Sequence, residues 1–324
     1  MKNILISGGA GYLGTVLTQY LLKKYNVIVY DKFYFPWLKK NKKLIKYSNR
    51  LTFINKNLTD VKIKDFKNID IVCDLNGIPN DPAAEINPKI TWDINYTGRL
   101  NFAKIAKKAG VKRYIFNSTC SVYGFNKNKV NESSKLNPVS TYAKANLKSE
   151  KKVYKLRSNS FKVYVLRNST LFGFSNVLRL DLVINLFVYN LLKNKNLIID
   201  GDGRQFRPFI SLTDICKIYH HLINNNKIPS FICNLVSFNS TIRDLALSVC
   251  KILKNKKSKI LFNENNKDKR NYYVVSNNFK DYFKKNFKFA NFSNEIKNLA
   301  KLIKKNNIKL NSQTIRLKFY KKLF

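Results

Sequence analysis

A cluster of glycines near the N-terminus has the spacing of a phosphate-binding loop. The apolar residues 4–6 are followed by GGAGYLG at residues 8–14, which satisfies G-x-G-x-x-G. Glycines at this spacing let the backbone turn tightly and approach a pyrophosphate without a Cβ in the way. The helical pattern that begins near Tyr12 would direct its free N–H groups at the same anion. The residues expected to hold it are Gly8, Gly11, Tyr12, Leu13 and Gly14.

Asp31 stands where a bound dinucleotide would place a ribose. Residues 27–30 form a second apolar run, and Asp31 follows it about 20 residues after the glycine loop. A carboxylate there accepts hydrogen bonds from a ribose hydroxyl, and it would repel a 2′-phosphate. The order of strand, loop, helix, strand and acid therefore predicts that NAD binds in preference to NADP. An ordinary strand-to-helix turn is the alternative interpretation.

Polar residues also follow a third short apolar run at 51–54. In a sheet of this kind the position lies beside the adenine, so Asn57 or Asp60 would accept a hydrogen bond from the base amino group. Leu58 lies between them and is expected at the same site. A plain polar turn explains the same residues equally simply.

Strand-like and helix-like patterns alternate through the first half of the chain. This alternation predicts an α/β fold of the Rossmann type, with a doubly wound parallel sheet covered by helices on both faces. Beyond Asn168, helical patterns are separated by short strands such as 231–235, which indicates a smaller mixed α/β domain. The expected units are an NAD-binding domain at 1–167, a substrate domain at 168–306 and a basic C-terminal tail at 307–324.

The composition excludes several classes of protein. No run approaches the ~20 apolar residues of a membrane span, and Met1 leads directly into the first strand, so a cytoplasmic protein with no membrane association is expected. The chain has 5 cysteines, widely spaced, and 2 histidines, which are adjacent. This pattern argues against a disulfide framework and against a metal site, and it favours reduced, buried thiols.

The net charge of +42 is the most unusual property of the composition. A polyanion-binding surface would produce such a charge, and so would a compositional bias towards lysine. The lysines are spread over every expected helix and loop, whereas a binding surface concentrates basic residues in one patch. We therefore expect no specific nucleic-acid partner.

Several further motifs resemble the extended short-chain dehydrogenase/reductase superfamily, in particular its NAD-dependent nucleotide-sugar epimerases and dehydratases. The resemblance runs from Met1 to about Asn306. Besides the glycine loop, its markers are Asn95 in INYTG, Ser118-Thr119 before VYG, Tyr142-Ala143-Lys144, Asn185, GDG at 201–203, Arg207 before PFI, Asp214 and Arg270.

The resemblance implies how such a site would work. Tyr142 would take the proton of a sugar carbinol while hydride passes to NAD, and Thr119 or Ser118 would orient the sugar oxygen. Asn95 would belong to the cofactor site. The nucleotide-diphosphate sugar would be held by Asn168, Asn185, Arg207 and Arg270, with surface arginine as the alternative for the last two. A homodimer formed by the helices that begin near Trp92 and Ser140 is also implied.

Two departures from the family pattern bear on catalysis. The family has Tyr-x-x-x-Lys, but this chain has Asn146 in place of the lysine, so the site loses a cation that stabilises the phenolate. Asn146→Lys is therefore expected to raise activity. Cys120 and Ser121 stand where dehydratases carry an Asp-Glu pair, which favours an epimerase or 4-ketoreductase. A pseudoenzyme that binds NAD and a nucleotide sugar without turnover is the alternative.

Overall fold

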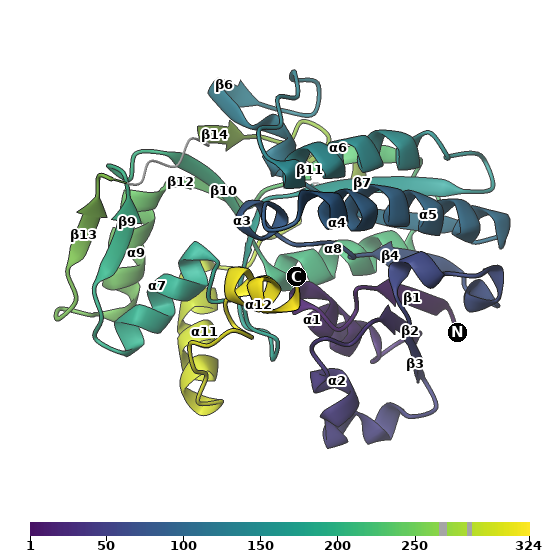
Figure 1. Ribbon diagram of the computed structural model, residues 1–324, viewed down its shortest axis with the longest axis horizontal. Coiled ribbons are helices and arrows are strands. Elements are labelled where there is room, and N and C mark those ends of the chain that lie inside the picture. Colours follow the sequence, from purple (N-terminus) through teal and green to yellow (C-terminus); the bar gives the residue numbers. More distant parts are fainter. Residues whose placement is uncertain (266–270, 284–286) are drawn as a thin grey trace.

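A seven-stranded parallel sheet forms the centre of the protein, in a computed structural model that describes residues 1–265, 271–283 and 287–324 (Figure 1). The strand order is β11-β7-β5-β4-β1-β2-β3. The strands are β1 (Asn3–Ser7), β2 (Asn26–Asp31), β3 (Leu51–Asn55), β4 (Ile71–Asp74), β5 (Arg113–Thr119), β7 (Lys162–Asn168) and β11 (Phe231–Leu235).

Helices cover both faces of this sheet. On one face lie α1 (Tyr12–Leu21) and α8 (Leu212–Asn224), and on the other lie α5 (Arg99–Lys108) and α6 (Thr141–Tyr154). Successive side chains of a strand point to opposite faces, so Ile4 and Ile6 join one core cluster and Leu5 joins the other. The apolar runs read from the sequence are therefore strands buried on both sides.

A second region lies beside the sheet and contains three mutually packed helices (Figure 1). They are α7 (Val183–Leu192), α9 (Ile242–Leu253) and α11 (Phe292–Lys305). Small sheets accompany them, formed by β8 (Thr170–Phe172), β10 (Phe206–Ser211) and β12 (Phe238–Thr241), by β9 (Leu197–Asp200) and β13 (Ile260–Asn263), and by β6 (Phe125–Val130) and β14 (Asn271–Val274).

Short helical elements complete the described chain. They are α2 (Trp37–Lys40), α3 (Asp81–Ala84), α4 (Pro88–Trp92), α10 (Phe279–Tyr282) and α12 (Arg316–Leu323), with 3-10 turns at Lys42–Tyr47, Leu58–Asp60, Ile63–Phe66 and Cys120–Tyr123 and a π-helical turn at Asp93–Gly98. The helix expected to begin near Trp92 thus contains a π-helical turn immediately before Arg99. In the described residues, no helix is long and apolar enough to cross a membrane.

The predicted fold class is confirmed, but one strand lies elsewhere than expected. We placed residues 231–235 in the substrate region, whereas β11 pairs in parallel with β7 at the edge of the central sheet. The physical reason is connectivity, because α8 serves as the crossover helix that returns the chain beside β7. The domain boundary expected at residue 167 remains a prediction.

Candidate functional site

A cavity of about 930 Å³ opens at the carboxyl ends of the central strands. In parallel α/β sheets this edge is where ligands bind, because several loops converge there. The glycine loop after β1 lines one part of the cavity, and Thr119 and Tyr142 line another. Residues of the second region and of α12 form the remaining walls. The cavity is large enough for more than one small ligand.

The glycine loop has the geometry that a dinucleotide pyrophosphate requires. Gly8 has φ +71°, and Gly11 N–H donates to Gly8 O at 3.1 Å, which closes the tight turn. A Cβ on Gly14 would meet Gly8 O at 2.4 Å and Gly9 Cα at 2.5 Å, so only glycine fits where α1 approaches the loop. Gly11 caps α1, and the free N–H groups of Tyr12 and Leu13 lie at the cavity wall. The residues present fit the predicted cofactor.

Asp31 connects the glycine loop to the segment after β2. Its carboxylate accepts hydrogen bonds from Ala10 N–H at 3.0 Å and from Phe33 N–H at 2.7 Å. Burial raises the pKa of Asp31, and these backbone hydrogen bonds act in the opposite direction. The carboxylate lines the cavity at the position expected for a ribose.

Asp31 gives a direct test of cofactor preference. We expect NAD to bind at least about tenfold more tightly than NADP, because a 2′-phosphate would face a carboxylate of like charge. Isothermal titration calorimetry measures both affinities, and Asp31→Asn should narrow the difference. Lys32, which also lines the cavity, opposes the effect, so Lys32→Met should widen it. Equal affinities for NAD and NADP would remove Asp31 from the ribose site.

Asn57, Leu58 and Asn95 all reach the cavity wall. Asn57 caps the 3-10 turn after β3, and its carbonyl accepts from the Tyr30 hydroxyl at 2.8 Å. Asn95 is fully buried, and its side-chain amide accepts from Ile78 N–H at 2.8 Å and donates to Ile78 O at 3.1 Å. Asn95 therefore holds the loop after β4 in place, in addition to lining the cavity.

Tyr142 and Thr119 come together at the cavity although they lie on different elements. Burial raises the pKa of the half-buried Tyr142, and a hydrogen bond with the Thr119 side chain lowers it. Ser118 has a different environment, because its hydroxyl donates to the buried Glu150 carboxylate at 2.6 Å. Glu150 in turn forms an ion pair with Arg167 at 2.7 Å. Of the two hydroxyls proposed to orient a sugar oxygen, Thr119 is the one in contact with Tyr142.

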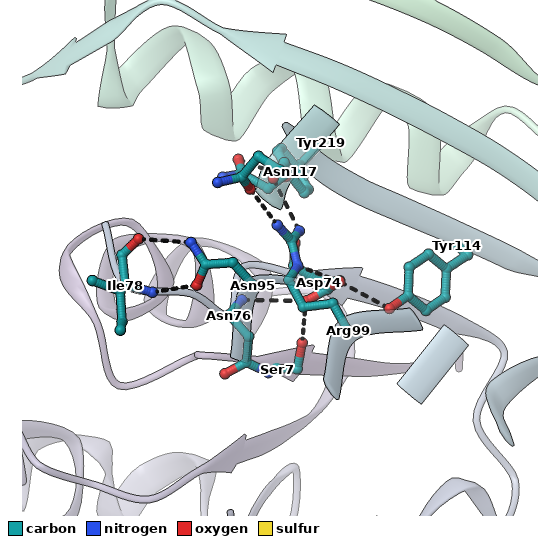
Figure 2. A network of polar contacts seen from close by, with 10 residues as sticks. Ser7, Asp74, Asn76, Ile78, Asn95, Arg99, Tyr114, Asn117 and Tyr219 are labelled. Atoms are coloured by element: carbon teal, nitrogen blue, oxygen red, sulfur yellow. Dashed lines mark hydrogen bonds and ion pairs between the residues drawn. The ribbon is translucent and has the colours of Figure 1, made fainter. Parts of the chain in front are cut away.

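Asn146 contacts the buried polar network around Arg99 and Asp74, and Figure 2 shows those two residues. Its amide oxygen accepts from Arg99 Nη1 at 2.9 Å, and its amide nitrogen donates to Tyr142 O at 2.8 Å. Arg99 forms an ion pair with Asp74 at 2.9 Å, and these two side chains are 1% and 0% exposed. Arg99, Asn146 and Tyr142 all line the cavity. The position expected to carry a lysine thus contacts a guanidinium from another helix.

The residues proposed for the substrate do not all reach the cavity. Asn168 and Arg207 line it; Asn168 hydrogen-bonds Asn117, and the Arg207 guanidinium lies 5.3 Å from the Tyr272 ring centroid. Asn185 does not line it, in contrast to the sequence expectation. Its oxygen accepts from Gly173 N–H at 3.1 Å, and its nitrogen donates to the Tyr12 hydroxyl at 3.0 Å and to Arg179 O at 2.9 Å. Full burial commits this amide to internal contacts. Arg270 lies outside the described residues.

Besides Arg99, sequence reasoning missed two cavity arginines, Arg179 and Arg316. Arg179 forms an ion pair with Asp181 at 2.7 Å. The Arg316 guanidinium donates to Gln313 O, and to Val177 O at 3.2 Å, and it lies 4.0 Å from the Phe35 ring centroid. Burial and the charge of Arg179 lower the pKa of Arg316 to about 10. A mixed basic and apolar tail gives no sequence signal for such a contact.

The C-terminal tail reaches the cavity because its apolar residues have partners on both sides. Leu180 N–H donates to Thr314 O at 2.8 Å, which anchors the start of α12. The Phe319 ring lies 4.7 Å from Phe35, and Tyr320 packs on the buried Ile78 cluster. In Figure 1, α12 lies between the central sheet and the second region. The tail that sequence analysis set apart is therefore part of the cavity wall.

Comparisons with known proteins agree with this geometry. The model of the NAD dependent epimerase/dehydratase family matches residues 4–234. The chain is 33% identical over 226 residues to the uncharacterized UDP-glucose epimerase YtcB of Bacillus subtilis, covering 66% of this chain and 70% of that protein. Relatives at lower identity include dTDP-D-glucose 4,6-dehydratases of Dictyostelium discoideum and Homo sapiens.

Solved structures show the same fold. The UDP-N-acetylglucosamine 4-epimerase of Methanobrevibacter ruminantium superimposes with a TM-score of 0.82 at 23% identity, covering 94% of this chain and 99% of that one. The UDP-glucuronic acid 4-epimerase of Bacillus cereus superimposes with a TM-score of 0.80 at 23% identity, with the same coverage. The matched residues 4–234 contain the glycine loop, Asp31, Thr119 and Tyr142. The chain belongs to the NAD-dependent epimerase/dehydratase family.

Proposed function

We propose that this protein is an NAD-dependent nucleotide-sugar epimerase or a related oxidoreductase that acts at a sugar carbinol. The observation that carries the proposal is that Tyr142 and Thr119 line the same cavity as the glycine loop. In this proposal, Tyr142 is the proton acceptor and Thr119 supplies a hydroxyl beside the expected cofactor site. NAD, when bound, supplies the hydride acceptor and donor.

We infer the following roles for the chain's own residues. Tyr142 takes the carbinol proton on its phenolate oxygen and returns it when the sugar is reduced again. Thr119 donates to or accepts from the same oxygen and so orients the carbinol. Asp31 binds the adenosine ribose, and the Arg207 guanidinium binds the diphosphate of the substrate. Arg270 is proposed to bind the same diphosphate.

We favour epimerisation or 4-ketoreduction over 4,6-dehydration. An elimination needs an acid and a base beside the sugar, and the two residues after Thr119 are Cys120 and Ser121. Cys120 is buried and donates to Arg167 O at 3.2 Å, and burial raises the pKa of its thiol to about 12. Neither side chain exchanges a proton readily at neutral pH.

The second candidate is a protein that binds NAD and a nucleotide sugar without turnover. The observation behind it is Asn146, which brings no cation of its own to Tyr142. One experiment separates the two candidates: purified protein is incubated with NAD and a panel of nucleotide sugars, and NADH absorbance and products by mass spectrometry are followed. An interconverted sugar supports the enzyme. Binding of both ligands with no product supports the second candidate.

Arg316 allows a test of the cofactor side of the proposal. We expect Arg316→Met to weaken NAD binding about tenfold, because its guanidinium lines the cavity and its positive charge would attract the cofactor diphosphate. The matched control is Lys318→Met, which removes the same charge from an exposed position of α12. Calorimetry measures both variants. Equal losses in the two variants would mean that the general positive field, and not a contact of Arg316, attracts NAD.

We also propose a homodimer formed by the helical segment that contains α4 and α5 together with α6. Trp92 and Tyr96 are half-buried there, and the Lys148 ammonium lies 5.5 Å and 4.7 Å from their ring centroids. Aromatic residues of this kind are common at subunit interfaces. Sedimentation as a monomer at micromolar concentration would contradict the proposal.

The cytoplasmic location expected from the sequence stays a prediction.

A further inference from the structure

Tyr142 needs a positive charge near its phenol, and its own helix does not provide one at Asn146. A phenol acts as a base only as phenolate, and a nearby cation stabilises that form. Burial raises the pKa of Tyr142, as does Asp81 of α3, whereas Arg179 and Arg99 lower it. Tyr320 of α12 and Tyr142 pack against the same small apolar cluster, which contains Ile78 and Ala83.

The two arginines differ in how their charges are held. Arg179 donates to both oxygens of Asp181, at 3.2 Å and 2.7 Å, so its guanidinium is paired in a bidentate manner with a carboxylate. Arg99 donates a hydrogen bond to the Asp74 carboxylate through its Nε alone, at 2.9 Å. Its Nη1 donates to the amide oxygen of Asn146, and its Nη2 donates to Asn117 O at 2.9 Å and to Asp74 O at 3.2 Å. The Arg99 guanidinium therefore directs a charged N–H group at Asn146.

Three other groups also hydrogen-bond the carboxylate of Asp74. Asp74 accepts from the Tyr114 hydroxyl at 2.9 Å, from the Ser7 hydroxyl at 3.0 Å and from Asn76 N–H at 3.2 Å (Figure 2). The Arg99 guanidinium also lies 3.8 Å from the Phe116 ring centroid. The buried ion pair is thus an oriented dipole whose positive end contacts Asn146.

Asn146 fits between these groups because an amide is both acceptor and donor. Its oxygen accepts from Arg99, and one of its two N–H groups donates to the backbone carbonyl oxygen of Tyr142, which fixes the orientation of the amide. A lysine ammonium has donors only and would oppose the guanidinium. Asn146 and Arg99 are therefore chemically matched to each other.

We propose that Arg99 is a positioning residue whose positive charge, held by Asn146 one helical turn from Tyr142 at the wall of the same cavity, stabilises the Tyr142 phenolate. This inference rests on the proposed role of Tyr142 as the base. Arg99 and Asn146 together take the place of a single lysine on α6. Arg99 provides the charge, and the second N–H group of Asn146 is assigned to a hydroxyl of the cofactor ribose.

The test is a pH titration of the Tyr142 phenol in the full chain, alone and with NAD, with no sugar present. NMR of protein labelled with ¹³C at the tyrosine Cζ reports ionisation, and Tyr142→Phe identifies the signal. Because no turnover is needed, failure of the proposed reaction leaves this measurement intact. The variants are Arg99→Met, Asp74→Asn and the double variant that carries both. Arg157→Met, on an exposed arginine, is the charge control.

The charges predict shifts of opposite sign. Arg99→Met should raise the Tyr142 pKa by about one unit or more, and Asp74→Asn should lower it, because the guanidinium then lacks its counter-charge. The Tyr142 pKa of the double variant should be higher than that of the natural protein. The Tyr142 pKa of Arg157→Met should equal that of the natural protein. Shifts of the same sign in both single variants, or none, would overturn the proposal.

A second comparison decides the question if Arg99→Met does not fold. The double variant leaves no unpaired buried charge, and Arg99→Lys keeps the cation. We expect Arg99→Lys to titrate close to the natural protein and the double variant to titrate higher. Equal Tyr142 pKa values in the natural protein and the double variant would show that the Arg99–Asp74 pair is only structural.

Discussion

Replacing Tyr142 with phenylalanine is expected to lower the turnover of a nucleotide sugar by a factor of about 10² to 10⁴, the range that a positioned general base contributes. The substitution removes only the hydroxyl that contacts Thr119, and the ring remains in the cluster with Ile78 and Ala83. Binding of NAD and the folded structure should change little. Product formation under saturating substrate measures the loss, and calorimetry with NAD checks binding.

The control for this prediction is Tyr154→Phe, on the same helix. The Tyr154 hydroxyl donates to Ser230 O at 3.3 Å, away from the cavity, so turnover should be retained. The pH profile adds a signature. Because burial raises the Tyr142 pKa above its usual value, the rate should increase about tenfold per pH unit from neutral towards alkaline pH. A Tyr142→Phe variant with full turnover would exclude Tyr142 as the base.

Asn146→Lys is expected to destabilise the protein by about 3–5 kcal/mol, the cost of a buried charge without a partner. From the sequence alone, this substitution was expected to restore activity. The structure changes that expectation, because Asn146 is 3% exposed and accepts a hydrogen bond from Arg99. A lysine would bring a second cation against the guanidinium and would remove its acceptor. Urea unfolding measures the loss, and Asn146→Met separates the effect of charge from that of shape.

A charge exchange tests the same explanation. In the double variant Arg99→Met/Asn146→Lys, one cation remains in the network with Asp74, so most of the lost stability should return. The coupling free energy between the two positions should be favourable and on the order of 1–3 kcal/mol. If the double variant is less stable than either single variant, the lysine does not reach Asp74 and repulsion from Arg99 is not the cause.

The central fold was predictable from local signals. A Gly8–Gly14 spacing that fits a turn, an apolar run that ends on Asp31 and the alternation of strands with helices depend on neighbouring residues only. Tyr142 and Thr119 were found through motifs of the same local kind. Their meeting in one cavity follows from the fold, since the ends of parallel strands and the helices that follow them converge at one sheet edge.

Other features depended on contacts between distant segments. Nothing near Arg99 in the sequence indicates that it contacts Asn146, or that Asp74 neutralises it. One signal was available, because Asp74 ends an apolar strand and a buried carboxylate requires a partner. The identity of that partner was decided by the packing of α5 and α6 over the sheet.

The sequence by itself thus determined the sheet, the glycine loop and the elements that carry Tyr142 and Thr119. Only the tertiary structure decided that β11 forms an edge of the central sheet, that the Asn185 amide is fully buried in internal contacts and that α12 lines the cavity. The physical reason is the sequence separation over which each kind of interaction acts. Backbone conformation and hydrophobic periodicity are set by residues close in sequence, whereas the partner of a buried charge or amide is set by which elements fold against each other.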